Sequence, residues 1–225
     1  MSAITLLIDV ALQMIKPNMT VSLGGGSNVN KLAKAIAENI QFPIKICTPS
    51  EITKASCQKL GFKIWEFDQL EHLDLAFDGC DSIDYGLHAL KSNGGIHVYE
   101  KLFAQAAAKY IILTPYSRIK PELDSKIPLT LEVLDSAVSS VDHFVHMLGG
   151  TSQIREAAGY AGAVRTRDGN PLVDCYFGGW GNIKEIDLML SRFNGVVGTS
   201  YFDKIVTNVL TINGNNKVEN LEREI

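Results

Sequence analysis

The sequence predicts an α/β protein with a mostly parallel sheet, helices on both faces of that sheet in three layers, and a smaller inserted α+β domain. The first half of the chain alternates between helical and extended patterns, which is typical of parallel sheets. From about residue 124 the order of elements becomes that of an α+β unit. With 225 residues, 46% of them hydrophobic, the chain can bury a core and exceeds one domain of about 150 residues.

In the first half, apolar side chains recur at helical spacing up to Pro17 and again after a run of glycines, where Ser27 or Asn28 is the predicted helix cap. In chain order we expect a helix over 4–15, a strand over 19–23, a helix over 29–40, a strand over 44–47 and a helix over 50–60. Strands over 63–66 and 73–77, a loop over 78–93, a helix over 95–108 and a strand over 110–113 follow. Ligands bind at the carboxyl ends of the strands in such sheets, where the glycine run and the loop over 78–93 both fall.

The second half predicts a strand over 127–133, a helix over 137–148, two strands around the turn 168–170, and a helix over 186–193. The segments 196–199 and 204–210 are predicted strands that could return to the main sheet, and the last dozen residues look like a polar tail. The predicted domains are therefore 1–123 joined by 198–225, with 124–197 inserted.

Composition excludes several classes of partner. The formal net charge is −4 and the basic residues are spread along the chain, so we expect neither a nucleic acid nor a membrane as partner. Apolar runs are far shorter than the ~20 residues of a membrane span, and the N-terminus has no leader features, so we expect a cytoplasmic protein. The four cysteines have no paired spacing, so we expect them to be reduced and mostly buried. His143 and His146 lack a nearby carboxylate–histidine set, and we expect no metal site.

The segment Gly24-Gly25-Gly26-Ser27-Asn28 between a predicted strand and helix is suited to binding an anion. Glycines let backbone N–H groups approach a phosphate, and the helix N-terminus adds partial positive charge. The segment has neither the ending of a P-loop nor the spacing of the dinucleotide fingerprint. The alternative interpretation is a tight turn before a capped helix.

Two further segments carry charged residues. Asp78-Gly79-Cys80-Asp81 ends a strand, and because crowded carboxylates cost stability, a ligand or a cation such as Lys91 is expected nearby. The alternative is an ordinary Asp-rich turn. Lys91-Ser92-Asn93-Gly94 leads into a helix that carries Glu100 one turn in, where an acidic residue usually complements the helix dipole.

Together these segments resemble the type A ribose-5-phosphate isomerases over nearly the whole chain. The match lies in the order and spacing of the glycine loop with Ser27, the segment 78–81, Lys91 and the pair Glu100-Lys101. Downstream, Arg155 and Asp174 also look like that family, as parts of its structural pattern.

The resemblance implies an aldose–ketose isomerase that interconverts ribose 5-phosphate and ribulose 5-phosphate, or a related sugar phosphate, through an enediolate without metal or organic cofactor. It implies the catalytic residues Glu100 as general base, Asp81 for ring opening and proton traffic, Lys91 for the oxyanion, and Asp78 to hold the arrangement. It implies a homo-oligomer, either a dimer or a tetramer. The expected substrate contacts are Gly25, Gly26, Ser27, Asn28, Asp78, Gly79, Cys80, Asp81, Lys91, Ser92, Asn93, Gly94 and Arg118.

The chain departs from the family pattern mainly among these contacts. Gly25 and Asn28 stand where the family's glycine loop commonly has threonines, and Arg118 stands where it has a lysine. The residues for proton transfer are retained, so we expect the same enediolate chemistry on a pentose phosphate or similar sugar. The alternative is a catalytically weak sensor of the same fold that binds sugar phosphates.

Overall fold

The computed structural model describes residues 3–223 and divides the chain into two compact units. The first unit holds the chain up to Cys80, Tyr99–Ile119, and the residues from Lys204 onward. The second unit holds Asp81–Val98 and Lys120–Asp203. The chain therefore passes between the units four times, and one of these passages separates Cys80 from Asp81.

The first unit is built on a six-stranded sheet with the strand order β14-β13-β6-β3-β1-β2. All neighbouring strands are parallel except β13 and β14, which confirms the predicted mostly parallel α/β sheet. The strands are β1 (Thr20–Leu23), β2 (Lys45–Cys47), β3 (Leu73–Asp78), β6 (Ala107–Leu113), β13 (Asn208–Ile212) and β14 (Val218–Glu222). The helices are α1 (Ala3–Met14), α2 (Ser27–Asn39), α3 (Glu51–Lys59) and α4 (His97–Ala106), the last of which crosses the boundary between the units.

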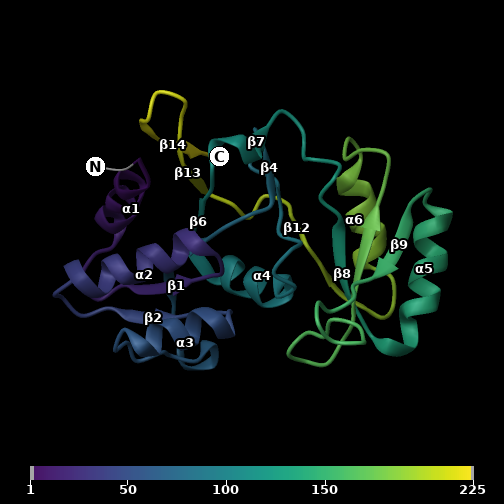
Figure 1. Cartoon of the computed structure of the whole chain (residues 1–225), viewed down its shortest axis with the longest axis horizontal. Coiled ribbons are helices and arrows are strands. Elements are labelled where there is room, and N and C mark those ends of the chain that lie inside the picture. Colours follow the sequence, from purple (N-terminus) through teal and green to yellow (C-terminus); the bar gives the residue numbers. More distant parts are fainter. Residues whose placement is uncertain (1–2, 224–225) are drawn as a thin grey trace. The chain divides into compact units, whose positions relative to one another are not determined.

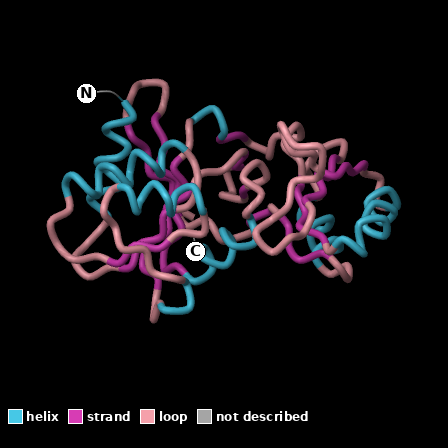
Figure 2. The backbone as a smooth tube through the Cα atoms, turned by 60° about the horizontal axis from the view of Figure 1, so that its bottom comes forward, coloured by secondary structure: helices cyan, strands magenta, loops and turns pink. Residues whose placement is uncertain are grey.

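The main core lies on one face of this sheet. Alternate strand residues such as Leu75 and Phe77 in β3 pack there with apolar side chains of α1 and α2. The residues between them, including Ala76 and Asp78, point to the other face because successive side chains of a strand alternate. Helices lie on both sides of the magenta strands of this unit in Figure 2, in agreement with the predicted layers.

The second unit contains a four-stranded antiparallel sheet with the order β11-β8-β10-β9. Its strands are β8 (Leu129–Val133), β9 (Thr151–Ile154), β10 (Leu172–Tyr176) and β11 (Val196–Thr199). Helices α5 (Val138–Met147) and α6 (Ile183–Ser191) pack with the sheet around a second apolar core. Figure 1 shows these helices beside the strands of the sheet. This arrangement confirms the smaller α+β part.

Short elements complete the fold. A further small sheet has the order β12-β5-β4-β7, from β4 (Ser82–Asp84), β5 (Ala89–Leu90), β7 (Ile119–Lys120) and β12 (Tyr201–Phe202). Single 3-10 turns are η1 (Phe67–Gln69), η2 (Tyr116–Arg118) and η3 (Asp135–Ala137).

Five local expectations were wrong. Of the two strands predicted around the turn 168–170, only β10 forms, and the segment before the turn contributes one isolated bridge, between Arg165 and Pro171. The predicted strand over 63–66 is reduced to one bridge between Ile64 and Ile46. The predicted loop over 78–93 contains the β4–β5 hairpin. The segment 196–199 is β11, which pairs with β8 in the antiparallel sheet and not with the main sheet. Five residues of the expected polar tail, Val218–Glu222, form β14, an edge strand paired with β13.

The two compact units also divide the chain differently from the predicted domains. Residues 81–98 group with the second unit, since β4 and β5 pair with one another and with β12. Leu90 of β5 belongs to the second apolar core. The segment 198–203 belongs to the second unit as well.

The cysteines are free and buried, as the sequence predicts. Burial raises the pKa of the Cys47 thiol to about 12, and it also raises the pKa of Cys57. Within residues 3–223, no helix combines the length and the apolar character that crossing a membrane requires.

Candidate active site

The glycine loop of the first unit leaves β1 and leads directly into α2. The cap of α2 is Gly26, whose φ of 100° is in the region that favours glycine, and no side chain caps the helix. Ser27 and Asn28 are therefore the first helical residues, and the expectation that one of them caps α2 was wrong. Backbone N–H groups of a first helical turn have no partners within the helix, so this turn can bind an anion.

Asp78 joins this loop to the end of β3. The carboxylate belongs to a residue that is only 2% exposed, and Oδ1 accepts hydrogen bonds from the amides of Gly25 (3.1 Å) and Gly79 (2.7 Å). A Cβ atom on Gly24 would lie 2.2 Å from the Asp78 Cγ atom, so only glycine fits at this close approach. Asp78 thus fixes the backbone of the glycine loop.

Sequence reasoning missed Tyr110 and Thr53, which support the same loop. The hydroxyl of Tyr110, in β6, donates to Oδ2 of Asp78 (3.1 Å), and that of Thr53, in α3, donates to the Gly24 carbonyl (2.7 Å). Burial raises the pKa of Tyr110 well above its usual value, and the charges of Asp78 and Glu100 raise it further. Tyr110 therefore remains a neutral donor.

Glu100 lies in the first turn of α4 and is 4% exposed. A Cβ atom on Gly25 would lie 3.9 Å from Oε1 of Glu100, so this carboxylate reaches the glycine loop. The negative charge of Glu100 also contributes to the raised pKa of Tyr110, so these two side chains interact. The first unit therefore places the buried side chains of Asp78, Tyr110 and Glu100 in one polar cluster beside the glycine loop.

Arg118 lies in η2 of the same unit, where its guanidinium donates to the carbonyl of Cys80. Cys80 is buried, and its thiol lies 3.7 Å from the Thr114 hydroxyl. The structure thus brings Arg118 to the segment 78–80.

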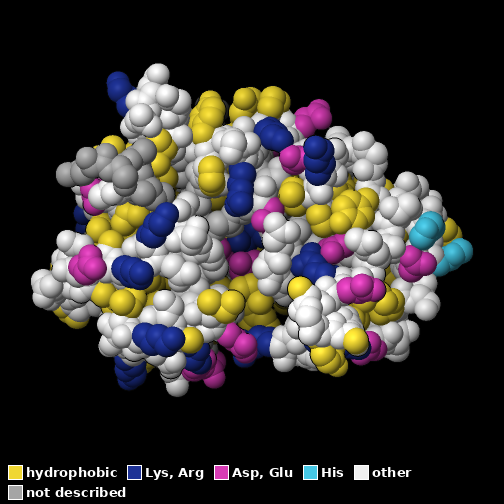
Figure 3. Space-filling view, in the orientation of Figure 1, with side chains coloured by type: hydrophobic (Ala, Val, Ile, Leu, Met, Phe, Trp, Pro, Cys, Tyr) yellow, Lys and Arg dark blue, Asp and Glu magenta, His cyan; other side chains and the backbone are white. Residues whose placement is uncertain are grey.

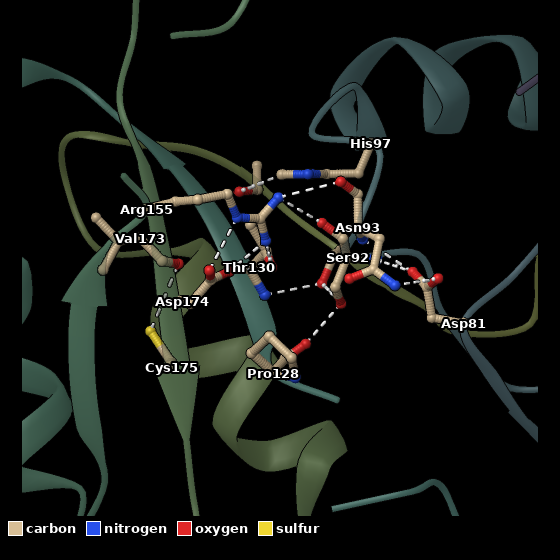
Figure 4. Close-up of polar contacts among 12 residues, drawn as sticks. Asp81, Ser92, Asn93, His97, Pro128, Thr130, Arg155, Val173, Asp174 and Cys175 are labelled. Atoms are coloured by element: carbon tan, nitrogen blue, oxygen red, sulfur yellow. Dashed lines mark hydrogen bonds and ion pairs between the residues drawn. The ribbon is translucent and has the colours of Figure 1, made fainter. Parts of the chain in front are cut away.

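The second unit positions Asp81 against the loop that follows Lys91. The Asp81 carboxylate accepts hydrogen bonds from the amide of Ser92 (2.7 Å) and from the amide and side chain of Asn93 (2.9 and 2.7 Å), as Figure 4 shows. The Ser92 side chain is fully buried, and its hydroxyl donates to the Pro128 carbonyl (2.6 Å). Asp81 and the loop therefore hold one another in place.

Lys91 is 5% exposed, which is unusual for an ammonium group. Its backbone amide donates to the Ser200 carbonyl (3.0 Å), and its Nζ atom lies 5.8 Å from the centroid of the Phe202 ring. Gly94 follows the loop and precedes α4. A buried cation of this kind is suited to stabilise developing negative charge.

The predicted site residues thus form two groups, one in each unit. The first unit holds the glycine loop, Asp78, Gly79, Cys80, Glu100 and Arg118, and the second holds Asp81, Lys91, Ser92, Asn93 and Gly94. Among the side chains in the described part of the chain, none of the groups of His, Cys, Asp and Glu has the arrangement of a metal site. On the face of the molecule drawn in Figure 3, Lys and Arg side chains are scattered, and Asp and Glu side chains lie among them.

Comparison with known proteins identifies similar chains along nearly the full length. A family model described as ribose 5-phosphate isomerase A (phosphoriboisomerase A) matches residues 45–216. Ribose-5-phosphate isomerase A of Prochlorococcus marinus (strain MIT 9312) is 30% identical, with 94% of this chain and 90% of the relative covered. The Methanococcus aeolicus protein of the same name is 31% identical, with 88% and 86% covered.

Solved structures agree with these sequence matches. The structure of ribose 5-phosphate isomerase A from Methanocaldococcus jannaschii is 25% identical and superposes with a TM-score of 0.90, with 98% of each chain covered. A D-ribose-5-phosphate isomerase in complex with phospho-erythronic acid has a TM-score of 0.92, 24% identity and the same coverage.

Proposed function

This chain belongs to the ribose-5-phosphate isomerase A family and interconverts ribose 5-phosphate and ribulose 5-phosphate, and we propose that Glu100 is the general base of that reaction. The reaction moves a proton between C1 and C2 of the open-chain sugar through an enediolate. The observation that supports Glu100 is its place in the first unit, buried in the first turn of α4 with Oε1 reaching the glycine loop. A base held in this way can abstract a proton from a substrate bound by the loop.

Lys91 and Asp81 act on the oxygens of the substrate. A carbon acid beside a carbonyl is weak, so the base is effective only if the developing oxyanion meets positive charge, and the Lys91 ammonium supplies it. Asp81 assists ring opening and moves protons between the sugar hydroxyls. Three hydrogen bonds from Ser92 and Asn93 fix the Asp81 carboxylate for this role.

The glycine loop and Arg118 bind the anionic end of a sugar phosphate. The first-turn amides of α2 provide N–H donors, and the loop backbone is held by Asp78. Gly26, Ser27 and Asn28 are at least partly exposed, so a ligand can approach them. Arg118 adds a cation beside Cys80. Gly79, Cys80 and Gly94 contribute backbone to the substrate contacts.

We further propose that the protein is a homo-oligomer, either a dimer or a tetramer. This proposal is based on the family to which the chain belongs. Sedimentation equilibrium at several protein concentrations measures the molar mass, and the 24.6 kDa of a single chain at every concentration would contradict it.

The general base is tested with the variant Glu100→Gln, which keeps the size of the side chain but removes the basic carboxylate. We expect kcat for ribose 5-phosphate to fall by about 10²–10⁴-fold, the usual contribution of a general base. In D₂O, NMR should show deuterium entering at C1 or C2 with the wild type and a matching loss of this exchange with the variant.

The matched control is Glu51→Gln, which changes an exposed glutamate in the first turn of α3. Its rate of turnover should equal that of the wild type. Equal rates of deuterium entry for Glu100→Gln and wild type would exclude Glu100 as the base.

A further inference from the structure

The guanidinium of Arg155 connects the antiparallel sheet of the second unit to the loop after Lys91. Its Nε atom donates to Oδ2 of Asp174 (2.8 Å) and its Nη2 atom to Oδ1 of the same carboxylate. Its Nη1 atom donates to the carbonyls of Ser92 (2.9 Å) and Asn93 (3.3 Å). Figure 4 shows the side chain extending from the sheet to this loop.

The sheet end of this connection is firmly anchored. Asp174 is 6% exposed and lies on β10, which is an inner strand between β8 and β9. The carboxylate binds Arg155 through both oxygens and also accepts a hydrogen bond from the Thr130 hydroxyl (2.6 Å). Since a two-point contact between arginine and a carboxylate fixes the plane of the guanidinium, the direction of the remaining N–H groups is fixed as well.

The loop end reaches Asp81 through a single peptide group. In a trans peptide, the carbonyl of one residue and the N–H of the next point in opposite directions within one plane. The Ser92 carbonyl accepts from Arg155 (2.9 Å), and the N–H on the other side of the same peptide, that of Asn93, donates to Asp81 Oδ2 (2.9 Å). A rotation of this peptide would therefore break both hydrogen bonds together.

We propose that Arg155 is a positioning residue for the isomerase reaction, which holds the Ser92–Asn93 peptide and thereby the Asp81 carboxylate. The proposal rests on the role of Asp81 proposed above. The donors to Asp81 from Ser92 and Asn93 all come from the loop that Arg155 binds from the other side, as Figure 4 shows. Arg155 acts through this peptide and not by contact with the substrate.

The test compares kinetics of Arg155→Met and Arg155→Lys with those of the wild type. A misplacement of a catalytic group by about 1 Å can cost about 10²-fold, so we expect kcat to fall about 10–100-fold while KM changes by less than about 3-fold. Lysine carries the charge but cannot bind a carboxylate and a carbonyl in the same fixed plane, so it should restore little activity. The matched control is Arg165→Met, which removes an exposed ion pair with Asp135 in the same unit and should leave kcat unchanged.

A double-variant comparison separates positioning of Asp81 from a general structural role. If Arg155 acts through Asp81, then adding Arg155→Met to Asp81→Asn should lower kcat by less than about 3-fold beyond the Asp81→Asn variant alone. The full 10–100-fold loss in the Asp81→Asn background would contradict the proposal. If Arg155→Met does not fold, the same comparison is made with Arg155→Lys.

A second readout does not depend on activity. Amide hydrogen exchange followed by NMR should become at least about 10-fold faster at Ser92 and Asn93 in Arg155→Met, while amides of α5 exchange as in the wild type. Unchanged exchange at these two amides would overturn the proposal. If Asp81→Asn alone left kcat unaltered, the proposed role of Asp81 would fail, and the exchange rates would still decide whether Arg155 holds the peptide.

Discussion

At the scale of single residues, Asp78 shows how one buried carboxylate can organise a binding loop. Its two oxygens accept hydrogen bonds from the amides of Gly25 and Gly79 and from the hydroxyl of Tyr110. A buried charge is tolerated when such donors surround it. Asp78 therefore holds the loop, and we propose that this is its part in the reaction, the role that the sequence resemblance implies for it.

The first prediction concerns Tyr110→Phe. The change removes the hydroxyl that donates to Asp78 and leaves the ring in its buried place, because phenylalanine has the same shape. Losing one donor to a buried carboxylate should lower the free energy of unfolding by about 1–3 kcal/mol. Urea denaturation followed by circular dichroism measures the difference.

The control for this prediction is Tyr160→Phe, at a residue that is 72% exposed. Its free energy of unfolding should match that of the wild type within about 0.5 kcal/mol. If both variants were equally stable, the Tyr110 hydroxyl would contribute nothing to the Asp78 cluster.

Single residues also show what the sequence could not predict. Asp78 and Glu100 stand out because they are charged and follow recognisable patterns, and the structure places both in one cluster. Tyr110 lies in an apolar strand, and the sequence pattern therefore predicts only a core residue there. Its hydroxyl reaches Asp78 because β6 pairs with β3 in a register that sets Tyr110 against Ala76 and Ile112 against Asp78. Strand neighbours and register are properties of the folded sheet, which periodicity alone does not reveal.

At the scale of elements, the helices and the longer strands were predictable because their apolar residues repeat over many positions. The β4–β5 hairpin was not, since strands of three and two residues are too short to show an alternation. The edge strand β14 is mostly polar, with Val218 and Leu221 as its two apolar residues, and it was taken for a tail. Polar residues are common on edge strands because they discourage pairing with other chains.

The second prediction compares the caps of α3 and α2. Ser50 caps α3, and its side chain accepts a hydrogen bond from the amide of Thr53 (3.2 Å), whereas α2 begins at Gly26 without a side-chain cap. Ser50→Ala should therefore lower the free energy of unfolding by about 1 kcal/mol. Ser27→Ala should change it by less than about 0.5 kcal/mol, because Ser27 is exposed and does not cap its helix.

Thermal and urea unfolding of the two serine variants measure this difference. A loss of stability in Ser27→Ala equal to that in Ser50→Ala would mean that Ser27 caps α2 in solution. The comparison thereby tests whether α2 is capped by Ser27, as the sequence suggested, or begins at Gly26 without a side-chain cap, as in the structure.

At the scale of the whole molecule, the proposed site residues are divided between two units of the chain. The glycine loop, Glu100 and Arg118 belong to the first, and Asp81 and Lys91 belong to the second. A sequence pattern can identify these residues without indicating that the chain changes units between Cys80 and Asp81. The proposed role of each group can be tested separately by binding.

The third prediction is that ribose 5-phosphate, which reaches equilibrium with ribulose 5-phosphate, stabilises the protein against thermal unfolding and that Arg118 and Lys91 each contribute to this effect. A ligand at about 100 times its Kd stabilises the native state by about 2.7 kcal/mol, which corresponds to a rise in Tm of roughly 5–10 °C for a chain of this size. Arg118→Met in the first unit and Lys91→Met in the second should each reduce this rise, because each removes a cation proposed to bind the anionic substrate. Arg165→Met, which removes an exposed cation, should leave it unaltered. A rise that either of the two site variants left unaltered would contradict the proposed role of that cation in substrate binding.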